Sequence, residues 1–98
     1  MLFVPGSRPD RFPKAMTAGA DAVVFDLEDA VESAQKEKSR SLIADYLATP
    51  RSMQALRFVR FNALDSETGQ ADIEFFRDVQ GFDGVLLPKV ETPGMLEM

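Results

Sequence analysis

The feature that most constrains the fold of this chain is a regular alternation of short apolar segments with longer amphipathic ones. Four short segments are rich in β-branched and aromatic residues, which favour strands. These predicted strands cover 2–4, 21–27, 56–61 and 84–88. The helical spacing of apolar residues predicts helices over 7–18, 33–47 and 70–79. Repeated βα units predict an α/β fold, with a parallel sheet and helices packed against it.

The ends of the predicted helices follow from their capping residues. Ser7, with Pro9 and Asp10 behind it, is the expected N-cap of the first helix. Gly19 and Gly81 are expected to end the first and third helices, because glycine readily adopts the left-handed backbone conformation. The polar composition of 62–69 predicts a loop before the third helix.

On pattern alone, a flavodoxin-like sheet and a (β/α)8 barrel are both compatible with this alternation. The chain ends soon after Thr92 and Pro93, which are typical of the start of another helix. A complete barrel takes about 250 residues, so four units are roughly half of one. We therefore expect residues 1–98 to be one partial domain, the N-terminal four βα units of a (β/α)8 TIM barrel.

Composition argues against several classes of protein. The net charge of −5 argues against general nucleic-acid binding. No apolar run approaches the roughly 20 residues of a membrane helix, so no membrane association is expected. The absence of cysteine fits a location in the reducing cytoplasm. The sequence also lacks histidine, so any catalysis depends on carboxylates, Lys, Arg, Tyr or an added metal.

Three acidic residues cluster at the end of the second predicted strand. Asp26 and Glu28 share one face, because side chains alternate along a strand, and Asp29 follows directly. Two neighbouring acids at the end of a buried strand need a cation, a basic side chain or backbone donors to compensate them. The cluster is therefore predicted to ligate a hard divalent cation, to hold its water ligands, or to form a structural ion-pair cluster.

Arg60 lies near the end of the third predicted strand, and Arg57 lies at an odd offset from it, on the opposite face. The guanidinium fork of an arginine suits a carboxylate or a thioester-linked acid. The alternative is an internal ion pair with Asp26 or Glu28, and the two interpretations are not exclusive.

Other basic residues follow strand ends, where barrels and open α/β sheets place their sites. Lys89 follows the fourth strand and is interpreted as an electrostatic stabiliser, a Schiff-base amine or the partner of a nearby glutamate. Arg8, Arg11 and Lys14 form a basic stripe. This stripe is predicted either to bind a phosphate or carboxylate at the helix N-terminus or to pair with Asp10 on a solvated face.

Four motifs in chain order cover nearly the whole sequence and resemble the citrate lyase β-subunit family of the HpcH/HpaI aldolase superfamily. They are LFVPGSRPDRF at 2–12, GADAVVFDLEDAV at 19–31, VRFN at 59–62 and DGVLLPKVE at 83–91. The resemblance implies a (β/α)8 barrel and a Mg²⁺-dependent carbon–carbon lyase. Such an enzyme cleaves or forms 3-hydroxyacyl thioesters such as citryl-, malyl- or citramalyl-CoA, and its products are an acyl thioester and a 2-oxo acid. The carrier is CoA or an acyl-carrier protein.

The same resemblance implies roles for individual residues. Arg60 matches an arginine that contacts the substrate carboxylate, and Phe3 and Lys14 match contacts to a CoA-type substrate. Glu28 and Asp29 match an acidic pair that lies near the metal without ligating it. The direct ligands, a Glu and an Asp, are expected beyond Met98, so these 98 residues alone are not expected to bind Mg²⁺ properly or to turn over substrate.

Arg11 and Lys89 complete the set of expected substrate-binding residues.

Two rival hypotheses remain beside the lyase. The chain is either a non-catalytic half-barrel that self-associates through its open sheet edges, or an aldolase that acts on free 2-oxo acids. The protein is expected to be a homo-oligomer.

Overall fold

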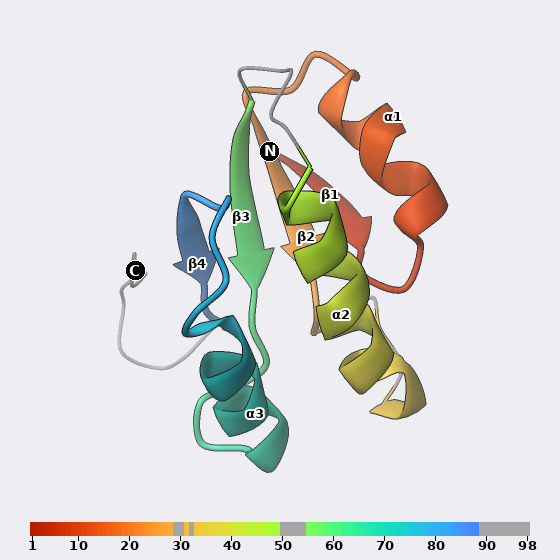
Figure 1. Ribbon diagram of the computed structural model, residues 1–98. Helices are drawn as coiled ribbons and strands as arrows, with labels where there is room; N and C mark the ends of the chain where they lie inside the picture. Colours follow the sequence, from red (N-terminus) through yellow and green to blue (C-terminus); the bar gives the residue numbers. More distant parts are fainter. Residues whose placement is uncertain (29–30, 32, 50–54, 89–98) are drawn as a thin grey trace.

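The structure is a computed structural model that describes residues 1–28, 31, 33–49 and 55–88. It contains a parallel sheet in which neighbouring strands follow one another in the order β1-β2-β3-β4 (Figure 1). The strands are β1 (Leu2–Pro5), β2 (Ala22–Asp26), β3 (Leu56–Arg60) and β4 (Gly84–Leu86). All four predicted strands are thus confirmed, with ends that differ by one or two residues.

The order of the strands decides between the two folds that the pattern allowed. A flavodoxin-like sheet has the order 2-1-3-4-5, with helices on both faces. Here the order is sequential, and the helices all cover one face of the sheet (Figure 1). The arrangement is that of consecutive βα units of a barrel, and it confirms the predicted fold class.

A row of apolar side chains in register carries the packing between sheet and helices. Val4, Phe25, Val59 and Val85 are Cα partners across the sheet, and each is at most 2% exposed. They belong to one core cluster with buried side chains of the helices. The rings of Phe12 and Phe25 meet edge to face at 5.0 Å. Burying each such side chain contributes roughly 1.5–3 kcal/mol.

In the described part of the chain, three α-helices lie on this core, two of them preceded by a 3-10 turn. They are α1 (Phe12–Met16) after η1 (Pro9–Arg11), α2 (Lys36–Leu47) after η2 (Ser33–Gln35), and α3 (Glu67–Phe76). Ile43 and Leu47 of α2 and Phe76 of α3 are buried in this core. Among the described residues, no helix is long and apolar enough to cross a lipid bilayer.

The first and third helices begin at other residues than predicted. Ser7 is not an N-cap, because the helical backbone starts with the 3-10 turn after Arg8, which caps it without a side-chain hydrogen bond. The third helix starts at Glu67 rather than at about residue 70, since the Oγ of Ser66 accepts a hydrogen bond from the backbone N–H of Gly69 at 2.9 Å. This side-chain cap lies inside the segment that was predicted to be a loop.

Both glycines have the expected conformation, but neither ends its helix directly, because α1 ends at Met16 and α3 at Phe76. Gly19 has φ +86° and Gly81 has φ +101°, values in the left-handed region that favours glycine. Gly81 also packs closely, because a Cβ on it would lie 2.5 Å from the carbonyl oxygen of Leu47.

Candidate active site at the carboxyl ends of the strands

An arginine–aspartate pair occupies the carboxyl ends of the two central strands. Asp26 ends β2 and Arg60 ends β3, and the register makes them Cα partners. The Nε of Arg60 donates to Oδ1 of Asp26 at 2.8 Å, and its Nη2 donates to Oδ2 at 2.7 Å. Both side chains lie on the face opposite to the helices, since Phe25 and Val59 beside them face the core. The result is a bidentate pair in which Asp26 is 1% exposed.

Glu28 stands next to this pair and is more accessible than Asp26. Its Oε1 lies 3.7 Å from Nε of Arg60, and its side chain is 27% exposed. Its backbone N–H donates to Oδ1 of Asp26 at 2.9 Å. The prediction that Asp26 and Glu28 share a face is confirmed. Their negative charges are compensated by a basic side chain and a backbone donor, two of the three means that the sequence allowed.

Phe3 of β1 links Arg60 to a hollow at the edge of the sheet. The Cζ of Arg60 lies 4.9 Å from the centre of the Phe3 ring, close enough for a cation–π contact. Phe3 also lines a hollow of about 770 Å³ between β1 and the first helical segment, whose wall includes Arg11 and Lys14. The structure therefore brings together three of the residues expected to bind substrate, with Phe3 in contact with the fourth, Arg60.

The basic stripe is not placed at a helix N-terminus, as one interpretation of the sequence expected. Arg8 pairs with Asp10, with Nε–Oδ1 3.2 Å and Nη2–Oδ2 3.1 Å. The hydrogen bond between Arg8 and Asp10 holds the pKa of Asp10 below its usual range, and the same hydrogen bond raises the pKa of Arg8. Without a cap at Ser7, and with α1 only five residues long, no helix N-terminus is available to an anion. The alternative, ion pairing with Asp10 on an exposed face, is confirmed for Arg8.

Arg57 and Arg60 lie on opposite faces, as their spacing predicted. Arg57 is 3% exposed and its Cζ lies 5.6 Å from the centre of the Tyr46 ring, on the helix side of the sheet. Two other expected site residues, Asp29 and Lys89, fall outside the described part of the chain. Within the described ranges, no three acidic side chains gather in a way that could hold a metal ion.

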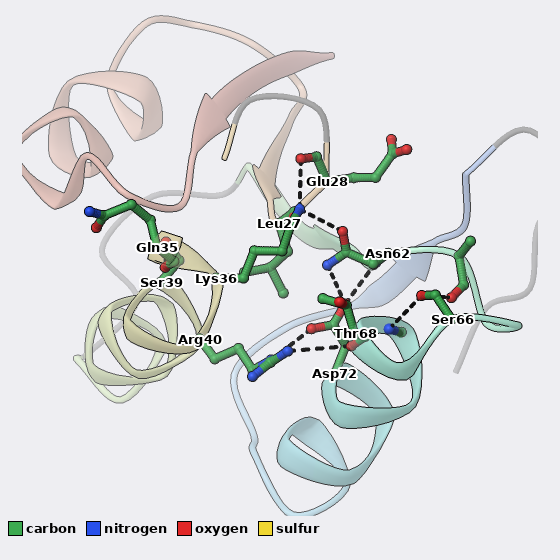
Figure 2. Close-up of polar contacts among 12 residues, drawn as sticks. Leu27, Glu28, Gln35, Lys36, Ser39, Arg40, Asn62, Ser66, Thr68 and Asp72 are labelled. Atoms are coloured by element: carbon green, nitrogen blue, oxygen red, sulfur yellow. Dashed lines mark hydrogen bonds and ion pairs between the residues drawn. The ribbon is translucent and has the colours of Figure 1, made fainter. Parts of the chain in front are cut away.

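A buried polar network behind the Arg60 pair was missed by the sequence analysis. Asp72 of α3 is fully buried and accepts three hydrogen bonds (Figure 2). Its Oδ1 accepts from Nε of Arg40 at 2.7 Å. Its Oδ2 accepts from the backbone N–H of Asn62 at 2.7 Å and from the Nδ2 of Asn62 at 2.8 Å. One signal was available, because Asp72 lies four residues before Phe76 and so on the buried face of its helix.

Lys36 joins this network to the end of β2. Its Nζ donates to the carbonyl oxygens of Leu27 at 2.8 Å and Glu28 at 3.0 Å, and to Oδ1 of Asn62 at 2.7 Å (Figure 2). Lys36 and Arg40 are four residues apart on α2, so both point from one helix face toward the strand ends.

Comparison with known proteins assigns the chain to a family. Residues 1–98 match the model of the family described as HpcH/HpaI aldolase/citrate lyase. The chain belongs to this family. The resemblance carried by the four sequence motifs is thereby confirmed.

Individual members of the HpcH/HpaI family are also similar to it. A (3S)-malyl-CoA thioesterase of Cereibacter sphaeroides is 40% identical over 99% of this chain and 34% of its own length. The citrate lyase β subunit of Mycobacterium tuberculosis, complexed with oxaloacetate and magnesium, matches with TM-score 0.76 and 40% identity over 93% of this chain and 38% of that one. The protein CitE of the same organism, complexed with magnesium, acetoacetate and coenzyme A, matches with TM-score 0.76 and 40% identity, over 93% and 32%. The chain thus spans about a third of the length of these relatives.

Proposed function

We propose that residues 1–98 are the N-terminal part of a (β/α)8 barrel lyase. This lyase cleaves or forms 3-hydroxyacyl thioesters, such as citryl-, malyl- or citramalyl-CoA, with an acyl thioester and a 2-oxo acid as the other side of the reaction. The observation that carries the proposal is Arg60, a cation fixed by Asp26 at the carboxyl ends of the strands and 22% exposed there. Sites of barrel enzymes lie at this end. The ligands of the M. tuberculosis relatives, coenzyme A, oxaloacetate and acetoacetate, support the substrate class.

In this proposal each residue has a distinct role. Arg60 binds the carboxylate of the 2-oxo acid and offsets negative charge that develops on the oxygens during cleavage. Asp26 keeps the guanidinium in one orientation, which lowers the cost of ordering it when substrate binds. Glu28 and Asp29 are assigned to act near the metal without ligating it.

The thioester carrier occupies the other part of the proposed site. Phe3, Arg11 and Lys14 contact it along the hollow beside β1, where two exposed cations suit its negative charges. Lys89 binds substrate from the fourth strand end.

Magnesium belongs to the complete enzyme in this proposal. When bound, it polarises the oxygens of the oxo acid as a Lewis acid. The residues described here do not fit a complete site for it, because both carboxylate oxygens of Asp26 accept hydrogen bonds from Arg60. Mg²⁺ usually needs one or two carboxylates besides water and substrate oxygens. We therefore assign its direct ligands to parts of the protein outside these residues.

The test is an assay of the complete protein with Mg²⁺ and a panel of hydroxyacyl-CoA esters, acyl-carrier-protein thioesters and free oxo acids. Arg60→Ala should lower kcat/KM by about 100-fold or more, since a fixed charge-stabilising donor is lost. Arg60→Lys keeps the charge but not the fork, so it should recover only part of the activity.

Arg77→Ala is the matched control, because Arg77 is exposed and forms an ion pair with the exposed Glu74, at 3.4 Å. It should leave kcat/KM unchanged. Full activity of a folded Arg60→Ala protein would remove Arg60 from the site. Turnover of free oxo acids but of no thioester would favour the rival aldolase.

A non-catalytic, self-associating half-barrel is the second candidate. It is favoured by the uncovered face of the described sheet, where Phe3 and Leu56 are each 46% exposed. We also propose a homo-oligomeric, cytoplasmic protein. Light scattering after size exclusion measures the mass of the 98-residue chain and of the complete protein. A 98-residue chain that is monomeric and unfolds cooperatively would contradict the self-associating half-barrel.

A further inference from the structure

We propose that Lys36 is a positioning residue that sets the distance between Glu28 and Arg60 by holding together the chain segments that follow β2 and β3. The inference rests on the proposed function, because it gives Lys36 a part in the work of those two side chains. It concerns a residue that does not lie in the Arg60 pair and that no sequence motif singled out.

The contacts of Lys36 begin where the sheet ends. The last hydrogen bond between β2 and β3 at this rim runs from the backbone N–H of Leu27 to the carbonyl oxygen of Arg60, at 3.0 Å. The carbonyls of Leu27 and Glu28 are the next acceptors along the chain, and Nζ of Lys36 binds both, at 2.8 and 3.0 Å (Figure 2). Where the neighbouring strand no longer provides donors, Lys36 therefore binds the backbone carbonyls of Leu27 and of Glu28 itself.

The third hydrogen bond of Lys36 reaches the segment after β3. Nζ donates to Oδ1 of Asn62 at 2.7 Å, and Asn62 follows Arg60 by two residues. Asn62 cannot easily turn away, because its own backbone and side-chain N–H groups both donate to the buried carboxylate of Asp72. One ammonium group thus connects the segments that carry Glu28 and Arg60.

The chemistry of lysine fits this position. An ammonium has three N–H donors and no acceptor, and the three oxygens that Lys36 contacts can use all of them. All three acceptors are neutral oxygens, whereas the neighbouring Arg40 pairs with a carboxylate, that of Asp72, at 2.7 Å. Removal of the Lys36 ammonium leaves three partly buried oxygens without this donor, and the two segments then lose the connection that continues beyond the last hydrogen bond between the strands.

The consequence reaches the site through the 3.7 Å separation between Oε1 of Glu28 and Nε of Arg60. A backbone shift of about 1 Å at either segment changes this separation by a comparable amount, and misplacement on that scale costs about 100-fold in rate. The Arg60–Asp26 pair has its own bidentate contact and stays in place. The loss is therefore expected in kcat, while binding at the hollow beside β1, which Lys36 does not line, is kept.

The experiment uses the complete protein and the variant Lys36→Met, which has a similar length but no donor. Its kcat should fall about 10- to 100-fold with KM for the thioester within about twofold. Lys36→Arg, which retains charge and donors, should recover part of the loss. In a Glu28→Gln background the same change should cost less than about threefold, because the two residues act as a unit.

Leu47→Ala is the stability-matched control, since Leu47 is buried at the far end of the same helix. It should lower the melting temperature but leave kcat within about twofold at a temperature where the variants are folded. A Lys36→Met protein that behaves like Leu47→Ala, or whose loss in kcat is independent of Glu28, would overturn the inference.

A readout without turnover separates this inference from the proposed function. Hydrogen exchange at the backbone amides of Leu27 and Asn62 should quicken at least tenfold in Lys36→Met relative to Leu47→Ala. If the unaltered protein cleaves no thioester, the proposed function fails while this measurement still tests the connection. If the unaltered protein is active and exchange and kcat are unchanged in Lys36→Met, the positioning role alone is refuted.

Discussion

The two acidic side chains at the end of β2 differ in how closely Arg60 engages their charge. Asp26 directs both carboxylate oxygens at Arg60 and accepts a third hydrogen bond from the backbone of Glu28. Glu28 lies farther from Arg60, at 3.7 Å, and its side chain is 27% exposed. Asp26 therefore acts as a structural partner of the arginine, and Glu28 is better placed of the two to act on substrate or on water near it.

This difference leads to a prediction for Glu28→Gln in the complete protein. We expect kcat to fall about tenfold or more, since a charge beside the reacting groups is removed. The affinity for Mg²⁺, measured by isothermal titration, should change by less than a few-fold, because Glu28 is proposed to act near the metal without binding it.

The control for that change is Glu37→Gln, at an exposed position of α2. Glu37→Gln should alter neither kcat nor the affinity for Mg²⁺. Loss of Mg²⁺ binding in Glu28→Gln would reassign this residue as a direct ligand.

At the scale of elements, Gly19 and Gly81, which lie in the segments after α1 and α3, provide a test of local conformation against packing. Both have positive φ, so alanine at either position adopts a conformation that costs roughly 1–2 kcal/mol. Gly81 also has a close neighbour, the carbonyl of Leu47 at 2.5 Å from its virtual Cβ, while no atom of the described residues lies within 4 Å of that of Gly19. Gly81→Ala should therefore destabilise the protein by more than Gly19→Ala, in urea unfolding of the complete protein. Equal losses of stability in the two variants would show that the backbone conformation alone, and not the contact with Leu47, determines the cost.

The elements were predicted better than their ends. Strand composition and helical spacing depend on residues close together in the chain, which is why every described element was expected. The start of α3 was missed because its cap, Ser66, lies in a polar segment without apolar residues to mark the helix period. The first helix was placed too early because Ser7 and Asp10 form a capping pattern, whereas Asp10 pairs with Arg8.

At the scale of the whole molecule, the buried ion pair of Arg40 and Asp72 joins α2 to α3 and both to the end of β3. Asp72→Asn should lower the free energy of unfolding by about 3–5 kcal/mol, because it leaves Arg40 buried without its carboxylate. Urea unfolding of the complete protein measures this loss.

Glu74→Gln is the comparison, on the same helix. Glu74 forms an exposed pair with Arg77, and such pairs contribute at most about 1 kcal/mol. A loss for Asp72→Asn as small as that for Glu74→Gln would mean that the buried pair contributes no more than a surface one.

The sequence by itself determined the α/β class, the strands, the faces of Asp26, Glu28, Arg57 and Arg60, and the family. These depend on spacing along the chain, since alternation in a strand and periodicity in a helix are local properties. Only the tertiary structure decided the sheet order, the pairing of Arg60 with Asp26, and the Lys36–Asn62–Asp72 connection. Residues such as Asp26 and Arg60 are 34 positions apart, and only the register of two neighbouring strands makes them partners.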